Sequence, residues 1–213
     1  MKILAIDTSG RQAGVAVVDG CAVLCAQVVR AIDDGGNWKH SQQLLPAIAA
    51  MLAAHDVDAA SLECVAYTCG PGSFTGLRIG AATALGLARG WNLPTISVPT
   101  LDAMAYNEII MRGAARAVAM LDARRGQVYA AVYARDAAGG MVRTTDYLAD
   151  AEEAVVTLAG DATVIRDVVE PAAVGLWAVE KALRGEFSQS GDELLYVRAP
   201  QAVRERAARE GAC

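Results

Sequence analysis

The stretch "KILAIDTSGRQAGVAVVDG", residues 2–20, decides the fold. It predicts two apolar strands joined by a polar turn that begins at Asp7, because alternating, β-branched runs bounded by Ser, Gly and Asp are typical of strands and turns. A similar unit returns at residues 117–133, "AVAMLDARRGQVYAAVY", with Asp122 in the place of Asp7. Recurrence of one supersecondary unit after about 115 residues indicates a duplicated fold. We therefore predict two lobes, residues 1–113 and 114–213.

The segments between these two hairpins complete the first lobe. Hydrophobic spacing and turn signals predict a third strand, a helix, a strand, a helix, a strand and a final helix, at residues 22–30, 40–55, 63–69, 76–91, 94–98 and 100–112. This βββαβαβα order predicts an α/β lobe with a mostly parallel sheet and an antiparallel edge. The second lobe is shorter, and we expect the last segment of the chain to pack back on the first lobe.

The composition excludes several classes of protein. An apolar fraction of 54% in 213 residues is enough for a sizeable core, and the apolar segments end well before the roughly 18 to 20 residues that a membrane span needs. A net charge of −5, with no cluster of Lys and Arg, argues against independent binding of tRNA or DNA, since that affinity comes largely from phosphate contacts. The first residues read as a strand rather than a signal peptide, so a cytoplasmic location is expected.

The five cysteines and two histidines do not predict a metal site. Cys21 and Cys25 are four residues apart, but no second pair and no nearby His completes a zinc set. His40 begins a predicted helix, yet the position four residues later is Leu44, so a His pair at i, i+4 spacing is absent. We therefore predict no metal and no cofactor.

Five motifs in order carry a resemblance to a known family. They read "ILAIDTS", "HSQQLLPAI", "GPGSFTGLRIG", "GLARGWNLPTISVPTLDAMA" and "LDARRGQVYAAVY". With them the chain resembles the TsaB (YeaZ) family of the actin-like ATPase superfamily, from Lys2 to about Tyr133. The resemblance implies an α/β fold made of a duplicated βββαβα unit, with two lobes of which the second is truncated.

The same resemblance implies a function. Members of the TsaB family are non-catalytic subunits of the bacterial machinery that makes N6-threonylcarbamoyladenosine at position 37 of tRNA. We expect the chain to form a heterodimer with the catalytic subunit TsaD, to help recruit the ATPase subunit TsaE, and to meet tRNA only through the complex. The family also implies a homodimer when the chain is alone.

The turns that hold phosphate and Mg²⁺ in nucleotide-using members of the superfamily are only partly retained. The first turn keeps Asp7, Thr8 and Ser9, while the second has Arg124 where a glycine two residues after Asp122 would let the backbone approach a phosphate. The glycine-rich "GPGSFTGLR" lacks the Lys of a P-loop. We read residues 70–72 as a tight corner and Ser73 or Thr75 as the cap of the next helix. Residues that could still form a vestigial nucleotide or anion site are Asp7, Thr8, Ser9, Ser73, Arg78, Asp122 and Arg124. The alternative function is a small actin-like kinase or ATPase that uses Asp7 and Asp122 with Mg²⁺.

The helix after the glycine-rich turn is the predicted docking element. Gly76, Gly80 and Ala84 recur at i, i+4 spacing, and a stripe of small residues lets another helix approach closely. The alternative is that this helix is buried within its own lobe. In the TsaB family the helices matching residues 41–54 and 75–91 pair with the same helices of TsaD. The predicted interface residues are Leu44, Leu45, Ile48, Met51, Leu52, Gly76, Ile79, Gly80, Thr83, Ala84 and Leu87.

Overall fold

A computed structural model describes residues 1–29, 40–188 and 194–197 of the chain. The first predicted lobe contains, in order, β1 (Lys2–Asp7), β2 (Ala13–Asp19), β3 (Ala22–Val29), α1 (His40–Ala54), the short 3₁₀ helix η1 (Ala59–Ser61), β4 (Cys64–Gly70), α2 (Phe74–Trp91), β5 (Thr95–Pro99) and α3 (Thr100–Tyr106), which continues as the π-helical turn η2 (Asn107–Met111). The predicted βββαβαβα order is confirmed.

The remaining elements form a second sheet and two helices, one of which packs on each sheet. They are β6 (Arg116–Asp122), β7 (Gln127–Arg135), β8 (Met141–Arg143), β9 (Leu148–Ala151), α4 (Glu152–Ala159), β10 (Thr163–Arg166) and α5 (Pro171–Leu183). None of the helices in the described ranges has the length and hydropathy of a transmembrane span.

The two sheets share one topology. In the first, the strand order is β3-β2-β1-β4-β5, with β2 antiparallel and β4 parallel to β1. In the second, the order is β10-β6-β7-β8, with β7 antiparallel and β10 parallel to β6, and β9 also pairs with β7. The hairpin of β6 and β7 therefore repeats that of β1 and β2, as the sequence predicted, and the duplicated α/β fold is confirmed.

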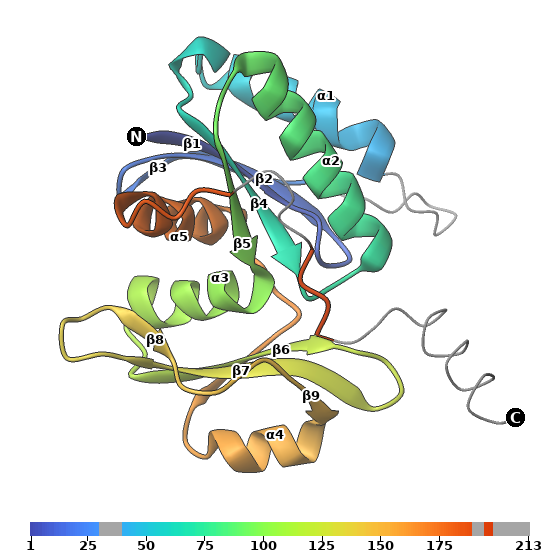
Figure 1. The fold of residues 1–213 in the computed structure, drawn as a ribbon, viewed down its shortest axis with the longest axis vertical. Coiled ribbons are helices and arrows are strands. Elements are labelled where there is room, and N and C mark those ends of the chain that lie inside the picture. The colour runs from blue at the N-terminus through green and yellow to red at the C-terminus, as the bar shows by residue number, and fades with distance from the viewer. Residues whose placement is uncertain (30–39, 189–193, 198–213) are drawn as a thin grey trace, which may run out of the picture.

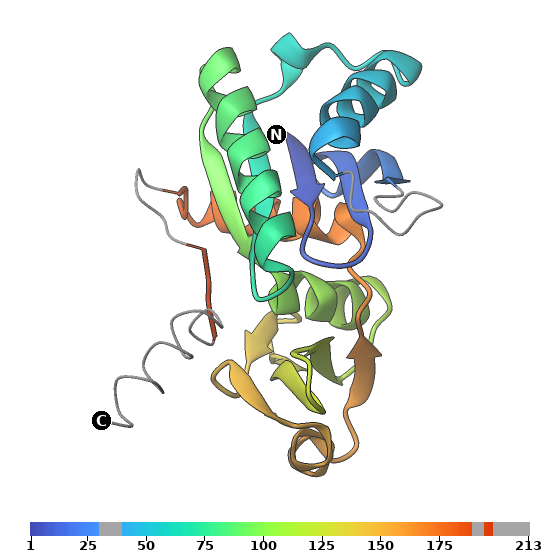
Figure 2. The same cartoon turned by 90° about the vertical axis from the view of Figure 1, so that its right-hand side faces the viewer.

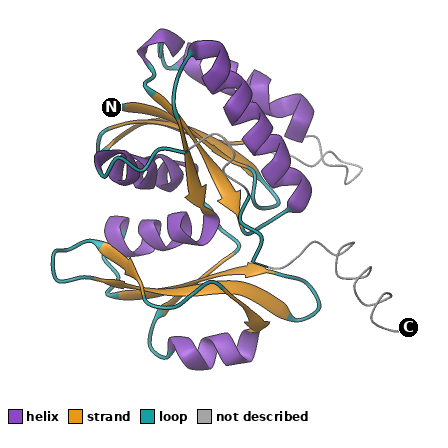
Figure 3. Cartoon of the chain, in the orientation of Figure 1, coloured by secondary structure: helices purple, strands orange, loops and turns teal. Residues whose placement is uncertain are grey.

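The elements stack in five layers, which Figure 1 and Figure 3 show from top to bottom: α1 with α2, the first sheet, α3 with α5, the second sheet, and α4. Buried side chains fill the spaces between these layers in four clusters. Helix α5 lies on the first sheet, although it follows the second sheet in the chain. The lobe boundary near residue 113 stays a prediction.

The last described segment, Leu194–Val197, also lies against the first sheet. The N–H of Leu195 donates to the carbonyl of Cys69 at the end of β4, over 2.8 Å. Leu194 and Leu195 pack against the core that β1, β2 and β4 share with α1 and α2. Figure 2 shows this segment running beside the start of α2.

Candidate functional site

The first hairpin turn holds a buried hydrogen-bond network around Asp7, while the buried Thr8 hydroxyl has no hydrogen-bond partner among the described residues. Asp7 is only 3% exposed, and its Oδ1 accepts bonds from the Ser9 N–H at 3.0 Å, the Ser9 hydroxyl at 2.6 Å and the Thr68 hydroxyl at 2.8 Å. Burial raises the pKa of Asp7, against the opposing effect of these bonds. One oxygen of the carboxyl group therefore accepts three hydrogen bonds from groups of the chain itself.

The glycine-rich corner packs directly onto this turn. The N–H of Ser73 donates to the carbonyl of Ser9 over 2.7 Å, and the Ser73 hydroxyl caps α2 by accepting from the N–H of Gly76 at 3.2 Å. A methyl group on Gly76 would lie 2.1 Å from the Thr8 carbonyl oxygen, and one on Gly80 would lie 2.1 Å from the Thr8 Oγ1. The first turns of α2 thus pack against Thr8, and of the two residues predicted to cap this helix, Ser73 or Thr75, the structure shows Ser73 in that role.

The second hairpin turn differs from the first because it is exposed. The Asp122 carboxylate accepts a bond from the Arg124 N–H at 2.7 Å, and the Asp122 N–H donates to Asp167 at 2.9 Å. Arg124 and Arg125 both have positive φ values, 65° and 58°. Arg124 forms no ion pair with any residue that the structure describes. The turn connects β6 and β7, and a role of Asp122 and Arg124 in anion binding stays a prediction.

The predicted anion site is only partly assembled. Asp7, Thr8, Ser9 and Ser73 lie together at the ends of β1 and β4. The Arg78 guanidinium carbon lies 3.8 Å from the centre of the Phe74 ring. Within the described ranges, no group of three or more His, Cys, Asp or Glu side chains could hold a metal ion.

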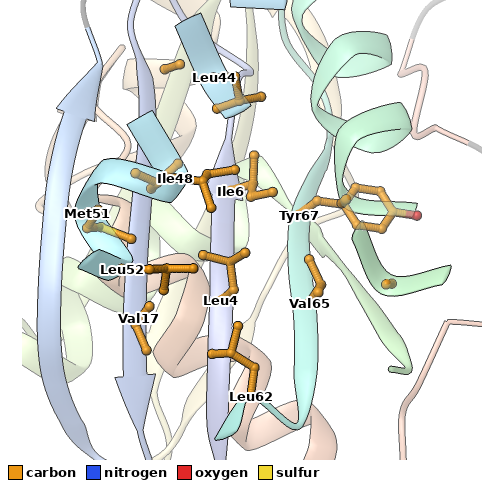
Figure 4. Close-up of a cluster of buried hydrophobic side chains, with 14 of the residues drawn as sticks. Leu4, Ile6, Val17, Leu44, Ile48, Met51, Leu52, Leu62, Val65 and Tyr67 are labelled. Carbon is orange, nitrogen blue, oxygen red and sulfur yellow. The ribbon is translucent and has the colours of Figure 1, made fainter. Parts of the chain in front are cut away.

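Many of the predicted interface residues lie in the core. Leu44, Ile48, Met51 and Leu52 are at most 8% exposed, and Figure 4 shows their side chains directed at the first sheet. The stripe of small residues faces inward as well, because Gly76 and Gly80 contact Thr8 and Ala84 is fully buried. In the described structure these residues pack inside the chain itself, and their place in a partner interface stays a prediction: Leu44, Ile48, Met51, Leu52, Gly76, Gly80 and Ala84.

A different face of the same two helices is open. Leu45 is 49% exposed, and Ile79, Thr83 and Leu87 are partly buried. A groove of about 320 Å³ is lined by Leu45 of α1 and by Ala82, Thr83, Gly86 and Leu87 of α2. We call this set of five residues the α1–α2 groove. The predicted interface residues did not include Ala82, Gly86 and the exposed Leu85, because α2 is apolar or small around most of its circumference and its period does not reveal which stripe meets the sheet.

A half-buried carboxyl group on another helix was not among the predicted site residues. Asp102, on α3, accepts hydrogen bonds from the hydroxyls of Tyr133 at 2.7 Å and Tyr147 at 2.8 Å. Burial raises the pKa of Asp102, and the two tyrosine bonds oppose the shift. The pairing joins α3 to the second sheet, and only the tertiary structure brings residues so distant in the sequence together.

Comparisons with known proteins identify relatives. A family model described as "TsaD: tRNA N6-adenosine threonylcarbamoyltransferase" matches residues 37–203. The chain is 40% identical over 144 residues to the tRNA threonylcarbamoyladenosine biosynthesis protein TsaB of Escherichia coli, and 34% over 133 residues to that of Bacillus subtilis. These alignments cover 65% and 62% of this chain but only 58% and 55% of the relatives, so the chain spans little more than half their length.

A solved structure supports the fold. YeaZ from Pseudomonas aeruginosa superposes with a TM-score of 0.76 and 23% identity, covering 92% of this chain and 99% of that one. At this identity the likeness shows a shared fold and no more.

Proposed function

We propose that the chain is an accessory subunit in the synthesis of N6-threonylcarbamoyladenosine at position 37 of tRNA. It belongs to the family whose model matches residues 37–203, and within that family to the TsaB (YeaZ) group. It binds TsaD through the open face of α1 and α2 and holds that catalytic subunit in an active shape. It also helps to recruit TsaE, and it meets tRNA only through the complex.

The observation that carries this proposal is the α1–α2 groove. Its lining is uncharged, and 49% of the surface is exposed both for Leu45, which lines it, and for Leu85 on the same helix as most of the lining. Exposed apolar side chains that gather around a concave surface are typical of protein interfaces. A helix from a partner would bury these side chains between its own residues and the two helices. The same groove is open to a second copy of the chain when TsaD is absent.

The geometry around Asp7 supports an accessory role over the alternative, a kinase or ATPase. A Mg²⁺ ligand has to be ionised and reachable, whereas Asp7 is buried, has a raised pKa and accepts three internal hydrogen bonds through one oxygen. The Ser73 N–H, which could otherwise bind a phosphate oxygen, donates to Ser9. These residues do not fit a Mg²⁺–nucleotide site, so we derive no step through one.

The experiment is reconstitution with the TsaD and TsaE proteins encoded in the same genome. The proposal predicts that the chain elutes with TsaD on a sizing column and that tRNA modification by TsaD falls sharply when the chain is left out. ATP hydrolysis by the chain alone that disappears in the Asp7→Asn variant would instead support the kinase or ATPase alternative.

A matched pair of substitutions tests the groove. Ala82 lines the groove and Ala154 lies on α4, and both are exposed alanines on helices. Ala82→Trp fills the groove and should weaken TsaD binding at least tenfold, with a parallel loss of tRNA modification. Ala154→Trp should change neither. If both variants bind TsaD as tightly as the unmodified chain, the complex forms through another surface.

A further inference from the structure

The segment Leu194–Val197 crosses the carboxyl end of β4 and runs beside the start of α2 (Figure 2). The N–H of Leu195 donates to the carbonyl of Cys69 over 2.8 Å. The rings of Tyr196 and Phe74 lie 5.8 Å apart, centre to centre. We call Leu194–Val197 the latch, because it joins the last described residues of the chain to the point where β4 gives way to α2.

The latch fits closely over the glycine-rich corner between these two elements. A methyl group on Gly70 would lie 2.5 Å from the Leu195 carbonyl oxygen, and the φ of Gly70 is +119°, a conformation that favours glycine. At the other end of the corner, the N–H of Ser73 donates to the carbonyl of Ser9, and α2 begins at Phe74. The latch therefore contacts both ends of the corner that places α2 on the first hairpin turn.

The latch is held more weakly than the strand that it covers. Leu194, Leu195 and Val197 are only half-buried, and Tyr196 is 38% exposed. The bond from Leu195 to Cys69 is the only backbone hydrogen bond between the latch and the rest of the described chain. Cys69 itself is 6% exposed, and its strand is paired on both sides. A segment with so few buried contacts and backbone bonds can open while the core below it stays folded.

We infer that the latch is a conformational switch built into the first sheet: it opens and closes as a unit over the carboxyl end of β4, and its closed position holds the glycine-rich corner and the start of α2 against the first hairpin turn. Closure shields the Cys69 thiol and keeps the Ser73 N–H on the Ser9 carbonyl. Opening uncovers this thiol and loosens the corner, while the sheet stays intact. The inference does not depend on the proposed function, because it concerns contacts within the chain.

Two thiols on one strand report the opening. Cys69 lies beneath the latch, whereas Cys64 is fully buried at the other end of β4, about 17 Å along the strand. Burial raises the thiol pKa of both to about 12, so neither reacts while it is covered. Prolonged alkylation of the native protein should therefore modify Cys69 at least tenfold faster than Cys64, and both far more slowly than the exposed Cys21. Equal rates at Cys69 and Cys64 would mean that both thiols react only through global unfolding, which overturns the inference.

A matched pair of leucine substitutions tests whether the latch controls this reaction. Leu195→Ala removes apolar contacts of the latch with the core. Leu93→Ala is the control, since Leu93 is a half-buried leucine that packs against the same core just beyond the far end of α2. Leu195→Ala should raise the rate of Cys69 alkylation about tenfold and leave the rate at Cys64 unchanged. Leu93→Ala should leave the ratio of the two rates unchanged, and an equal increase of that ratio in both variants overturns the inference.

Hydrogen exchange, corrected for the intrinsic rate of each residue, tests whether the corner follows the latch. In Leu195→Ala, exchange of the N–H at position 195 and of the Ser73 N–H should accelerate by the same factor, about ten. The N–H of Val65, which donates to the carbonyl of Pro94 at the start of β4, should exchange as it does in the unmodified protein. Faster exchange at position 195 without a change at Ser73 overturns the inference. So does an equal acceleration at Val65, because it would report a general loss of stability.

Discussion

Replacement of Gly76 by alanine tests whether α2 is buried against the first hairpin turn. The added methyl group would lie 2.1 Å from the Thr8 carbonyl oxygen and 3.2 Å from the Cβ and hydroxyl of Ser73. Thr8 is 1% exposed, and its carbonyl belongs to the backbone beside β1. Because a backbone oxygen in the core has no room to retreat, the helix or the turn has to move. We therefore expect Gly76→Ala to destabilise the protein.

The magnitude follows from two opposing effects. Overpacking a dense core costs about 1 to 3 kcal/mol, and a contact this short belongs at the upper end. Alanine favours the helix by about 1 kcal/mol over glycine, which leaves a net loss near 2 kcal/mol. Gly86 is the matched control, since a methyl group there meets nothing within 4 Å. Gly86→Ala should therefore stabilise the protein by about 1 kcal/mol.

The assay is urea unfolding followed by circular dichroism, with thermal melts beside it. In a chain of this size, about 1 kcal/mol changes Tm by roughly 2 to 4 °C. Gly76→Ala should therefore melt about 4 to 8 °C lower than the unmodified protein, and Gly86→Ala about 2 to 4 °C higher. Equal and small effects of the two substitutions would refute the packing of α2 on Thr8. The small-residue stripe would then be available for docking, as the sequence first suggested.

Two further predictions concern buried ionisable groups. Burial raises the pKa of Asp102 in the folded protein, so its contribution to stability is present below its ordinary pKa and is lost as the pH rises through the folded pKa. The side-chain oxygen of Asn in Asp102→Asn can still accept the tyrosine hydrogen bonds, but this side chain does not ionise. The difference in Tm between this variant and the unmodified protein should therefore grow in favour of the variant from pH 4 to pH 8. A difference in Tm that stays constant over this range would contradict the prediction. Burial also raises the thiol pKa values of Cys64 and Cys69 to about 12, and the thiolate is the reactive form. Alkylation of the native protein at pH 8, mapped by mass spectrometry, should modify the exposed Cys21 and spare these two thiols; equal labelling of all three would contradict their burial.

The fold was largely predictable because it depends on local patterns. Alternating apolar residues on both sides of Asp7 and of Asp122 determined the two hairpins, and their repetition determined the duplicated architecture. The order of strands and helices in the first half followed from hydrophobic period and turn residues. The position of α5 was not predictable in this way, since it lies on the first sheet although it follows the second one in the chain.

The open face of α2 was less predictable than the fold. The helix is apolar or small around most of its circumference, so its sequence period does not distinguish the stripe that meets Thr8 from the stripe that faces outward. The stripe of Gly76, Gly80 and Ala84 predicts a docking surface because small residues let another helix approach closely. The same small residues also allow close contact with a backbone turn, as at Thr8. The exposed arginines contained the missing information. A charged side chain is rarely buried without a partner, so Arg78 and Arg89 mark the outward direction of α2 directly from the sequence.

The packing of α2 on the first hairpin turn bears on both proposed functions, nucleotide binding at the turn and docking of a partner on the helix. The close approach of Gly76 and Gly80 to Thr8 pushes the start of α2 against the turn that contains Asp7, and the Ser73 N–H is used by Ser9. The contact that fills the space beside the carboxylate also fixes α2 on the sheet, with Ala82, Leu85 and Gly86 turned outward. A nucleotide-using protein needs the opposite arrangement, in which the helix stands back from the turn and leaves its N–H groups free for phosphate. Close packing at this point depends on glycine at positions 76 and 80, and it supports our proposal of a docking face over that of a nucleotide site.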